Sequence, residues 1–290
     1  MAEVVHVQSF AEYWQAVKRI APMQGEDEML FFRGVSNASY GWLTGIQVNA
    51  LQPHAKGEDD FYHSLLLEYP EDFDRKDHLE VLAKMQHYGL PTRLLDMSTN
   101  ILTAAFFAVE QNQSVSGKVD VFRVKKRDVL HHNSDRARML ACLPPLRSEV
   151  KAQITDFCRT HPGKITDQQI VGHPEMEKLL HEIRGEFPAF ETAIIGEDLL
   201  RSFFVQAQLS NPRMRVQSGF FLITGLDAAE QERYLRHCHV ATLKIAAGAK
   251  KEFLKDLEWM HVKTDTIYPD LERTALYIRS KKLRWGDLGD

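Results

Sequence analysis

Residues 84–110 read KMQHYGLPTRLLDMSTNILTAAFFAVE, which joins a group of polar side chains to a helical pattern with almost no polar residue. The second half, 101–109, is apolar on nearly every side, so we expect a helix that is buried all round. Ser98 or Thr99 is placed to cap this helix with a side-chain hydroxyl. The helix is therefore expected at the centre of the core.

The first half of the same segment is a turn between two polar pairs. Residues 89–91 form a Gly-x-Pro turn that restricts the backbone, with Gln86-His87 before it and Thr92-Arg93 after it. Polar groups beside a buried helix must be satisfied by one another or by a ligand. In the first case Arg93 pairs with Asp96, and His87 is a hydrogen-bonded core residue. In the second case the segment lines a binding site.

An earlier motif, Phe32-Arg33-Gly34, follows the short apolar run at 29–32. The run predicts a strand, and an arginine that leaves a buried strand can present a planar, permanently charged group to a phosphate or carboxylate. Gly34 allows the backbone to approach whatever lies beside it. A surface acid is the simpler partner for such an arginine.

Two later motifs carry further candidate residues. Residues 211–221, NPRMRVQSGFF, place Gln217 on an expected strand beside Gly219. Residues 267–272, IYPDLE, place Asp270 and Glu272 at the start of a helix, where carboxylates also favour the helix dipole. Helix capping is as good an explanation for these two acids as catalysis.

Apolar spacing and capping patterns predict an α+β chain. Helices are expected at 9–20, 77–88, 101–109, 228–237, 248–260 and 271–284, and strands at 29–32, 119–124, 216–224 and 240–245. The stretch 35–52 is expected to be irregular, and 131–200 to be an inserted helical subregion. Without an internal repeat or linker, residues 1–290 are interpreted as a single domain.

Composition narrows the class of protein. The chain of 290 residues is 44% hydrophobic and 26% charged, which excludes collagen-like, disordered and coiled-coil classes. A net charge of −4 argues against a uniformly basic nucleic-acid binder. The three cysteines, Cys142, Cys158 and Cys238, form no C-x-x-C pair, so a disulfide framework or structural zinc motif is not expected. With no signal-peptide pattern and no apolar run of ~18 residues, a cytoplasmic location is expected.

The small net charge is a sum of opposed local charges. Residues 58–80 hold nine acids and two bases, whereas 121–160 hold nine bases and four acids, and 273–284 hold five bases and no acid. Solvated helix faces explain such runs, and an anionic ligand along one side of the fold is the alternative.

Taken together, the motifs resemble those of the FRG-domain family, named for its Phe-Arg-Gly motif. The matching segments are FFRG (31–34), QHYGLPTRLLD (86–96), STN (98–100) with AAFFA (104–108), RVQSGFF (215–221) and YPDLE (268–272). They follow the family's order across 31–272. Two positions depart from it, Met97 where an aromatic is usual and Ser218 where a second glutamine is common.

The same order also resembles, more weakly, the ADP-ribosyltransferase superfamily. That resemblance implies a split, mixed or antiparallel sheet flanked by helices, and NAD as substrate without a metal. It implies that Arg33 contacts the NAD phosphates or ribose and that Ser98 and Thr99 position the nicotinamide ribose. The remaining residues of the implied cleft are Gly34, His87, Tyr88 and Arg93.

Gln217 falls where that superfamily has its catalytic glutamate. A glutamate stabilises the oxocarbenium-like centre as nicotinamide leaves, whereas glutamine offers only a hydrogen bond. Three interpretations stay open: Gln217 suffices, another acid such as Glu272 or Glu68 supplies the charge, or the domain is inactive.

The resemblance thus implies an NAD-dependent ADP-ribosyltransferase or NAD glycohydrolase, acting as a bacterial or phage toxin or defence effector. Its acceptor would be a protein or a nucleic acid, RNA included, and it would need an antitoxin or other neutralising partner. The first alternative is a non-catalytic module that binds a nucleotide or nucleic acid through Arg33 and the basic stretches. The second is a metal-dependent hydrolase, for which no histidine spacing offers a convincing set of ligands.

Overall fold

The computed structural model describes residues 2–73, 77–191, 194–206 and 219–268 of the chain. Within these residues, eight strands form two four-stranded sheets. The first has the order β1 (Glu3–Val7), β8 (His239–Ile245), β4 (Gly117–Lys125), β2 (Glu28–Val35), and the second has the order β3 (Leu94–Met97), β7 (Phe220–Ile223), β6 (Phe203–Gln206), β5 (Val129–His131). Each sheet contains one parallel pair, β1 with β8 and β5 with β6, and is otherwise antiparallel. The α+β class with split, mixed sheets is confirmed.

A single backbone pairing joins the two sheets beside the FRG motif. The Phe32 N–H donates to the Ser98 carbonyl at 2.7 Å, and the Ser98 N–H donates to the Phe32 carbonyl at 2.9 Å. Phe32 lies on β2 of the first sheet, and Ser98 follows β3 of the second. Arg33 and Ser98, which are distant in sequence, therefore lie at the same junction.

Helix α6 (Ile101–Val109) packs across the first sheet at very short range. An added Cβ at Gly34 would lie 1.8 Å from the Ala104 carbonyl oxygen, and one at Gly117 would lie 1.9 Å from that of Ala108. Because no side chain fits between these backbones, both strands need glycine where α6 crosses them. Gly34 of the FRG motif thus serves helix–strand packing, and α6 is buried as its sequence predicts.

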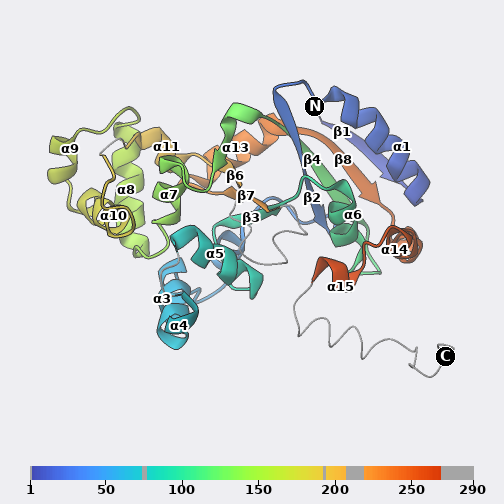
Figure 1. Ribbon diagram of the computed structural model, residues 1–290, viewed down its shortest axis with the longest axis horizontal. Helices are drawn as coiled ribbons and strands as arrows, with labels where there is room; N and C mark the ends of the chain where they lie inside the picture. Colours follow the sequence, from blue (N-terminus) through green and yellow to red (C-terminus); the bar gives the residue numbers. More distant parts are fainter. Residues whose placement is uncertain (1, 74–76, 192–193, 207–218, 269–290) are drawn as a thin grey trace.

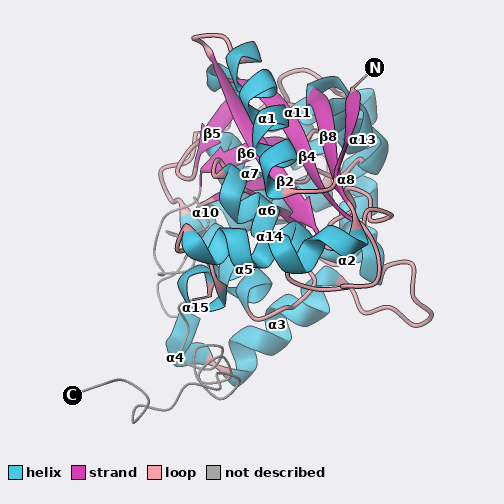
Figure 2. Ribbon diagram, turned by 90° about the vertical axis from the view of Figure 1, so that its right-hand side faces the viewer, coloured by secondary structure: helices cyan, strands magenta, loops and turns pink. Residues whose placement is uncertain are grey.

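Three helices cover one face of the first sheet. Figure 2 shows α1 (Phe10–Ile20), α6 and α14 (Lys250–Trp259) lying over β2, β4 and β8, and their apolar side chains form one core cluster with those strands. A second cluster lies between the two sheets and includes Phe31, Phe122 and Phe204, which α13 (Ala228–Cys238) covers. The rings of Phe31 and Phe204 stack with centroids 4.5 Å apart.

The third core cluster belongs to a helical region on the left of Figure 1. Its helices are α3 (Glu58–Glu68), α4 (Pro70–Phe73), α5 (His78–His87), α7 (Asp135–Ala141), α8 (Ser148–Thr160), α9 (Asp167–Val171), α10 (Pro174–Glu186) and α11 (Gly196–Leu200). The last five lie between β5 and β6 in the chain. The short helices α2 (Gly45–Asn49) and α15 (Thr264–Ile267) complete the described elements, with 3-10 turns at Ala21–Met23, Lys126–Asp128 and Ala247–Ala249.

Several sequence predictions need correction. Helix α6 begins where predicted, but its cap is Asn100, whose side chain accepts from the Leu102 and Thr103 N–H groups, and not Ser98 or Thr99. The stretch 35–52, expected to be irregular, contains α2. The sequence reading missed strands β1, β3, β5 and β6 because each has five residues or fewer. The helix predicted at 271–284 and the first part of the strand predicted at 216–224 lie outside the described residues.

None of the helices in the described part of the chain is both long and apolar enough to span a membrane.

Candidate functional site

A cavity of about 200 Å³ opens where the two sheets meet. It is lined by Phe32, Arg33, Gly34, Val35, Ser36, Tyr40, Asp96, Met97, Ser98, Phe107, Glu110, Gln111, Gly219, Phe220 and Phe221. Its walls come from the end of β2, the end of β3, the end of α6 and the start of β7. We call this the Arg33 cavity.

Arg33 is the charged residue that sets the character of this cavity. Its Nε is buried and has no hydrogen-bond partner among the described residues, and its Nη1 donates only a long bond of 3.5 Å to the Asp96 carbonyl. Burial lowers the pKa of Arg33 from its ordinary value, while Asp96 and Asp120 act in the opposite direction. Arginine nevertheless stays protonated in proteins, so a positive charge lies here with incomplete compensation. An anionic ligand would supply what is missing.

Asp120 is a buried carboxylate near Arg33 that bonds other donors. It lies directly opposite Arg33 in the β2–β4 register, yet its oxygens accept from Trp42 Nε1 at 2.8 Å and Thr242 Oγ1 at 2.6 Å. Lys118 Nζ lies 3.0 Å away as well. Burial alone would raise the pKa of Asp120, but these groups and His239 hold it well below its usual range. The oxygens of Asp120 thus already accept hydrogen bonds from other donors.

The motif QHYGLPTRLLD leads into strand β3, which carries Asp96. Thr92 Oγ1 donates to Gln86 Oε1 at 2.6 Å and accepts from the Leu94 N–H at 3.1 Å, and Gln86 Nε2 donates to Asp96 Oδ2 at 3.3 Å. Gly89 ends α5 with φ of 80°, a conformation in which glycine is favoured. Gln86, Thr92 and Asp96 therefore bond one another in series, and of these three Asp96 lines the Arg33 cavity.

Lys250 fixes the rim of the same cavity from α14. Its ammonium is fully buried and donates to the carbonyls of Ser36, Gln111 and Asn112 at 2.6, 2.9 and 3.1 Å. Ser36 and Gln111 line the cavity, one after β2 and the other after α6. One buried cation thus holds both loops in place.

The predicted binding residues do not all come together. Arg33, Gly34 and Ser98 line the cavity, whereas Thr99, His87, Tyr88 and Arg93 do not. The Ser98 hydroxyl accepts from the Asn100 N–H at 3.0 Å and so shapes the turn before α6. Tyr88 is 66% exposed at the end of α5, where its ring packs edge-on against His87.

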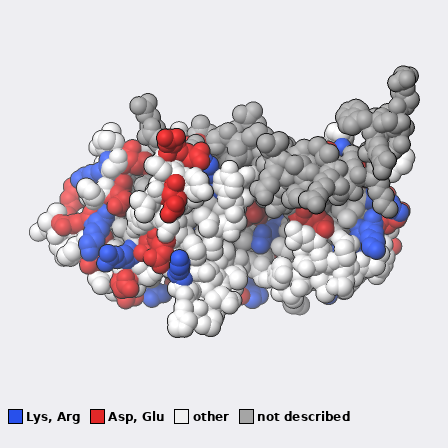
Figure 3. Space-filling view, turned by 90° about the horizontal axis from the view of Figure 1, so that it is seen from below, with Lys and Arg blue, Asp and Glu red and all other residues white. Residues whose placement is uncertain are grey.

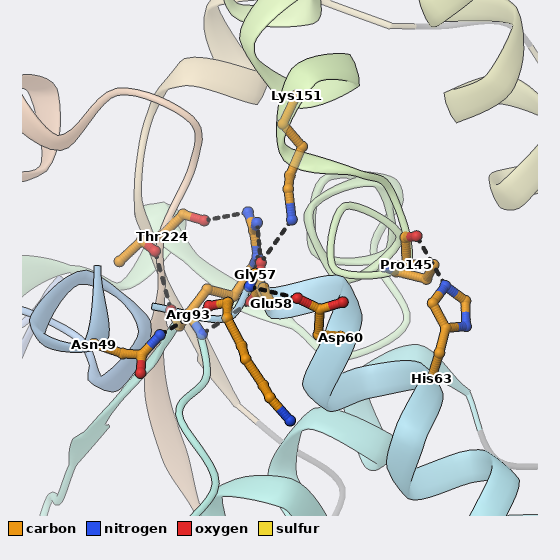
Figure 4. A network of polar contacts seen from close by, with 10 residues as sticks. Asn49, Gly57, Glu58, Asp60, His63, Arg93, Pro145, Lys151 and Thr224 are labelled. Carbon is orange, nitrogen blue, oxygen red and sulfur yellow. Dashed lines mark hydrogen bonds and ion pairs between the residues drawn. The ribbon is translucent and has the colours of Figure 1, made fainter. Parts of the chain in front are cut away.

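Arg93 lies in a second hollow, of about 460 Å³. Figure 4 shows its guanidinium between Glu58 and Thr224: Nε lies 3.1 Å from both Glu58 oxygens, Nη2 bonds Oε2 at 2.5 Å, and Nη1 donates to the Thr224 carbonyl at 3.1 Å. Lys151 Nζ reaches the same carboxylate at 3.4 Å. Arg93 therefore pairs with Glu58 and not with Asp96. All of its polar atoms are used within the fold.

The predicted catalytic residues Gln217 and Glu272 lie outside the described residues. Gly219, two positions after Gln217 in the sequence, lines the Arg33 cavity. Glu68 is exposed at the end of α3 and does not line it. The carboxylates that do line it are Asp96 and Glu110, and the latter accepts from Tyr268 Oη at 2.6 Å.

Sequence reasoning had not identified Tyr40 and Glu110 as site residues. Tyr40 comes from the irregular stretch after β2, and Glu110 follows the last residue of α6. The only signal was that Glu110 ends the buried helix that begins beside Ser98.

The basic stretch 121–160 does not form one anion-binding face. Five of its nine bases pair with carboxylates: Arg123 with Glu28, Arg127 with Asp128, Arg136 with Asp198, Lys151 with Glu58 and Arg159 with Asp156 and Asp227. On the face seen in Figure 3, acidic and basic side chains alternate without a continuous basic surface. The basic stretch 273–284 lies outside the described residues.

Comparison with known proteins agrees with the motifs. Residues 28–116 match the family model of the FRG domain, so the chain carries an FRG domain. Every lining residue of the Arg33 cavity except Gly219, Phe220 and Phe221 lies within that match. No curated protein and no solved structure matches the chain. That the FRG domain extends over all 290 residues stays a prediction.

Proposed function

We propose that the Arg33 cavity binds NAD and that the protein transfers ADP-ribose from it, or hydrolyses it. The supporting observation is the buried Arg33 Nε, which has no partner among the described residues, beside a cavity whose described walls come almost wholly from the FRG domain. A diphosphate is the anionic part of NAD, and a guanidinium fork matches its oxygens. Ligand pockets usually measure about 300–1,000 Å³, so the described walls suit one part of the dinucleotide.

In the proposed reaction the bond between nicotinamide nitrogen and ribose C1′ breaks, and nicotinamide leaves as a neutral molecule with the electron pair of that bond. The nucleophile, a group on the acceptor or a water molecule, forms the new bond to C1′ and loses its proton. Arg33 holds the diphosphate, so that the ribose is oriented before the bond breaks. A carboxylate beside C1′ stabilises the developing positive charge.

Two carboxylates are available for this role in the described walls, Asp96 and Glu110. Asp96 accepts from Gln86, and Glu110 accepts from Tyr268, so each is oriented by a hydrogen bond. Either would supply the negative charge that Gln217 lacks. Asp96→Asn and Glu110→Gln, which remove charge at constant shape, identify the one that acts.

A protein or nucleic-acid acceptor, a role as a toxin or defence effector, and a neutralising protein partner belong to the same proposal. The second candidate function is a non-catalytic nucleotide-binding module. It is favoured by glutamine at position 217, where the resembled enzymes have glutamate.

The test incubates the full-length protein with NAD labelled in the adenylate part, with and without bacterial lysate. We expect nicotinamide release by the pure protein, or label transfer to a lysate component. Arg33→Ala is expected to lower either rate at least tenfold. Arg123→Ala is the matched control, a half-exposed strand arginine on β4 that does not line the cavity.

The outcomes separate the candidates. NAD binding that is lost in Arg33→Ala, without turnover in the wild type, supports the non-catalytic module. If the wild type neither binds NAD nor turns it over, both functions are contradicted. Equal activity in the wild type and Arg33→Ala contradicts the site.

A further inference from the structure

Three side chains that are far apart in the sequence meet in the helical region, away from the Arg33 cavity. His78 is the first residue of α5, Cys142 directly follows α7, and Glu186 is the last residue of α10. Cys142 is fully buried, and the side chains of His78 and Glu186 are only 17% and 13% exposed. None of the three lines the Arg33 cavity.

The distances among these groups suit a common ligand. One imidazole nitrogen, one thiol sulfur and one carboxylate oxygen all lie within 4.8 Å of one another. The His78 Nε2 and Glu186 Oε2 atoms are 3.4 Å apart. A mixture of nitrogen, sulfur and oxygen donors is typical of zinc, which takes four ligands at about 2.0–2.3 Å in a tetrahedron. Small side-chain shifts bring the three donors to that spacing.

Tyr62 orients the histidine for this role. Its hydroxyl lies 2.5 Å from His78 Nδ1, and its ring packs beside the imidazole with centroids 5.7 Å apart. With Nδ1 held by Tyr62, Nε2 is the nitrogen that faces Glu186. In metal sites the second ring nitrogen of a histidine ligand is regularly fixed by such an outer hydrogen bond.

Acidic side chains outnumber basic ones among the described residues that act on Cys142. Glu182 and Asp77 act electrostatically on Cys142 together with Glu186, whereas Arg138 is the cation that opposes them. The Arg138 guanidinium lies 3.5 Å from the ring centroid of Phe187, and Arg138 makes no ion pair with another described residue. Three carboxylates therefore lie near one arginine, and a divalent cation would offset the negative charge of these acids.

We propose that His78, Cys142 and Glu186 bind one Zn²⁺ ion, with water as the fourth ligand. The Cys142 thiol loses its proton to solvent as the Zn–S bond forms, and no oxidation or reduction takes place. The ion joins α5 to α7 and α10. It therefore stabilises the packing of the helical region onto α5, the helix that leads into the QHYGLPTRLLD motif. Neighbouring residues in the sequence give no sign of the site, because its ligands are separated by more than forty positions each.

The test titrates Co²⁺, a coloured substitute for zinc, into the metal-free full-length protein. We expect one Co²⁺ per chain, a thiolate-to-cobalt charge-transfer absorption, and its disappearance when Zn²⁺ is added. Cys142→Ser is expected to abolish the charge-transfer absorption. Cys158→Ser is the matched control, because Cys158 is also fully buried in the helical region but belongs to no such cluster.

A second variant keeps the proposal falsifiable if Cys142→Ser does not fold. Glu186→Gln is expected to weaken Zn²⁺ binding at least tenfold and to remove the rise in Tm that Zn²⁺ causes in the wild type. No charge-transfer absorption in the wild type, or the same absorption in Cys142→Ser, overturns the proposal. Equal zinc affinity in the wild type and Glu186→Gln removes Glu186 from the ligands and overturns the site as drawn.

Discussion

Two arginines of the FRG domain, the half-buried Arg33 and the buried Arg93, lie in hollows that differ in kind. Arg93 bonds Glu58 and the Thr224 carbonyl with all of its nitrogens, whereas among the described residues Arg33 has no partner for its Nε and makes one long bond to the Asp96 carbonyl. The hollow at Arg93 is the larger of the two, at about 460 Å³ against about 200 Å³. Hydrogen-bond satisfaction, and not volume, therefore distinguishes the two arginines: the donors of Arg93 are all used within the fold, whereas those of Arg33 are not all used by the described residues.

The largest expected difference between the two arginines is in their contribution to stability. Arg93→Met leaves the Glu58 carboxylate buried beside Lys151 alone, so we expect the free energy of unfolding to fall by about 3–5 kcal/mol. Arg33→Met removes a charge that lacks a full set of partners, and its cost is expected to stay below about 1 kcal/mol. Urea unfolding of both variants measures the difference. Equal losses would mean that the two arginines have the same structural role.

The acid side of the stability curve gives a smaller effect, because protonation weakens the Glu58 cluster without removing a side chain. Burial by itself raises the pKa of Glu58, but Arg93 and Lys151 bring it below its ordinary value. A depressed carboxyl pKa contributes stability that is present above the unfolded pKa of about 4.3 and is lost as the pH falls through the folded pKa. Unfolding between pH 6 and pH 2 should show this loss in the wild type and in Arg33→Met. If Arg93→Met shows the same slope, the pair is not its source.

Thr92→Val tests whether the hydrogen bonds next to Arg93 in the chain also hold Asp96 at the Arg33 cavity. The buried Thr92 hydroxyl joins Gln86 to the Leu94 N–H, and we expect its removal to cost about 1–2 kcal/mol. Because Gln86 also holds Asp96, ligand affinity at the Arg33 cavity should fall too, as titration calorimetry would measure. Thr160→Val, an exposed position whose hydroxyl bonds its own helix, should stay within about 0.5 kcal/mol. A loss of stability without any change in affinity would show that the position of Asp96 does not depend on Thr92.

The smallest effect concerns the turn between Gln86 and Arg93. Gly89 has φ of 80°, so Gly89→Ala is expected to cost about 1 kcal/mol although an added Cβ meets nothing within 4 Å. Gly163→Ala, also in open space but without positive φ, is expected to be neutral. Thermal unfolding compares the two. A neutral Gly89→Ala would show that the turn tolerates another backbone geometry.

The sequence predicted the FRG strand, the buried helix after Ser98 and their closeness, because these follow from local patterns and from the family's motif order. It did not separate the two arginines, because the partner of Arg93 is Glu58, 35 positions earlier in an acidic run typical of a solvated surface. Glu58 is in fact 3% exposed. Short strands such as β3 were missed for a related reason, since four residues carry too little periodicity to be identified without their neighbours.

The position of β8 has a consequence for the order in which the protein matures on the ribosome. Within the described sheet β8 separates β1 from β4, and Lys250 follows it to hold the loops after β2 and α6. A growing chain that has completed residues 28–116 thus possesses the FRG domain's sequence, but neither the first sheet nor the rim of its cavity is assembled. Translation must pass residue 250 before the Arg33 cavity is complete. The residues that line the cavity are therefore synthesised well before the cavity itself can form.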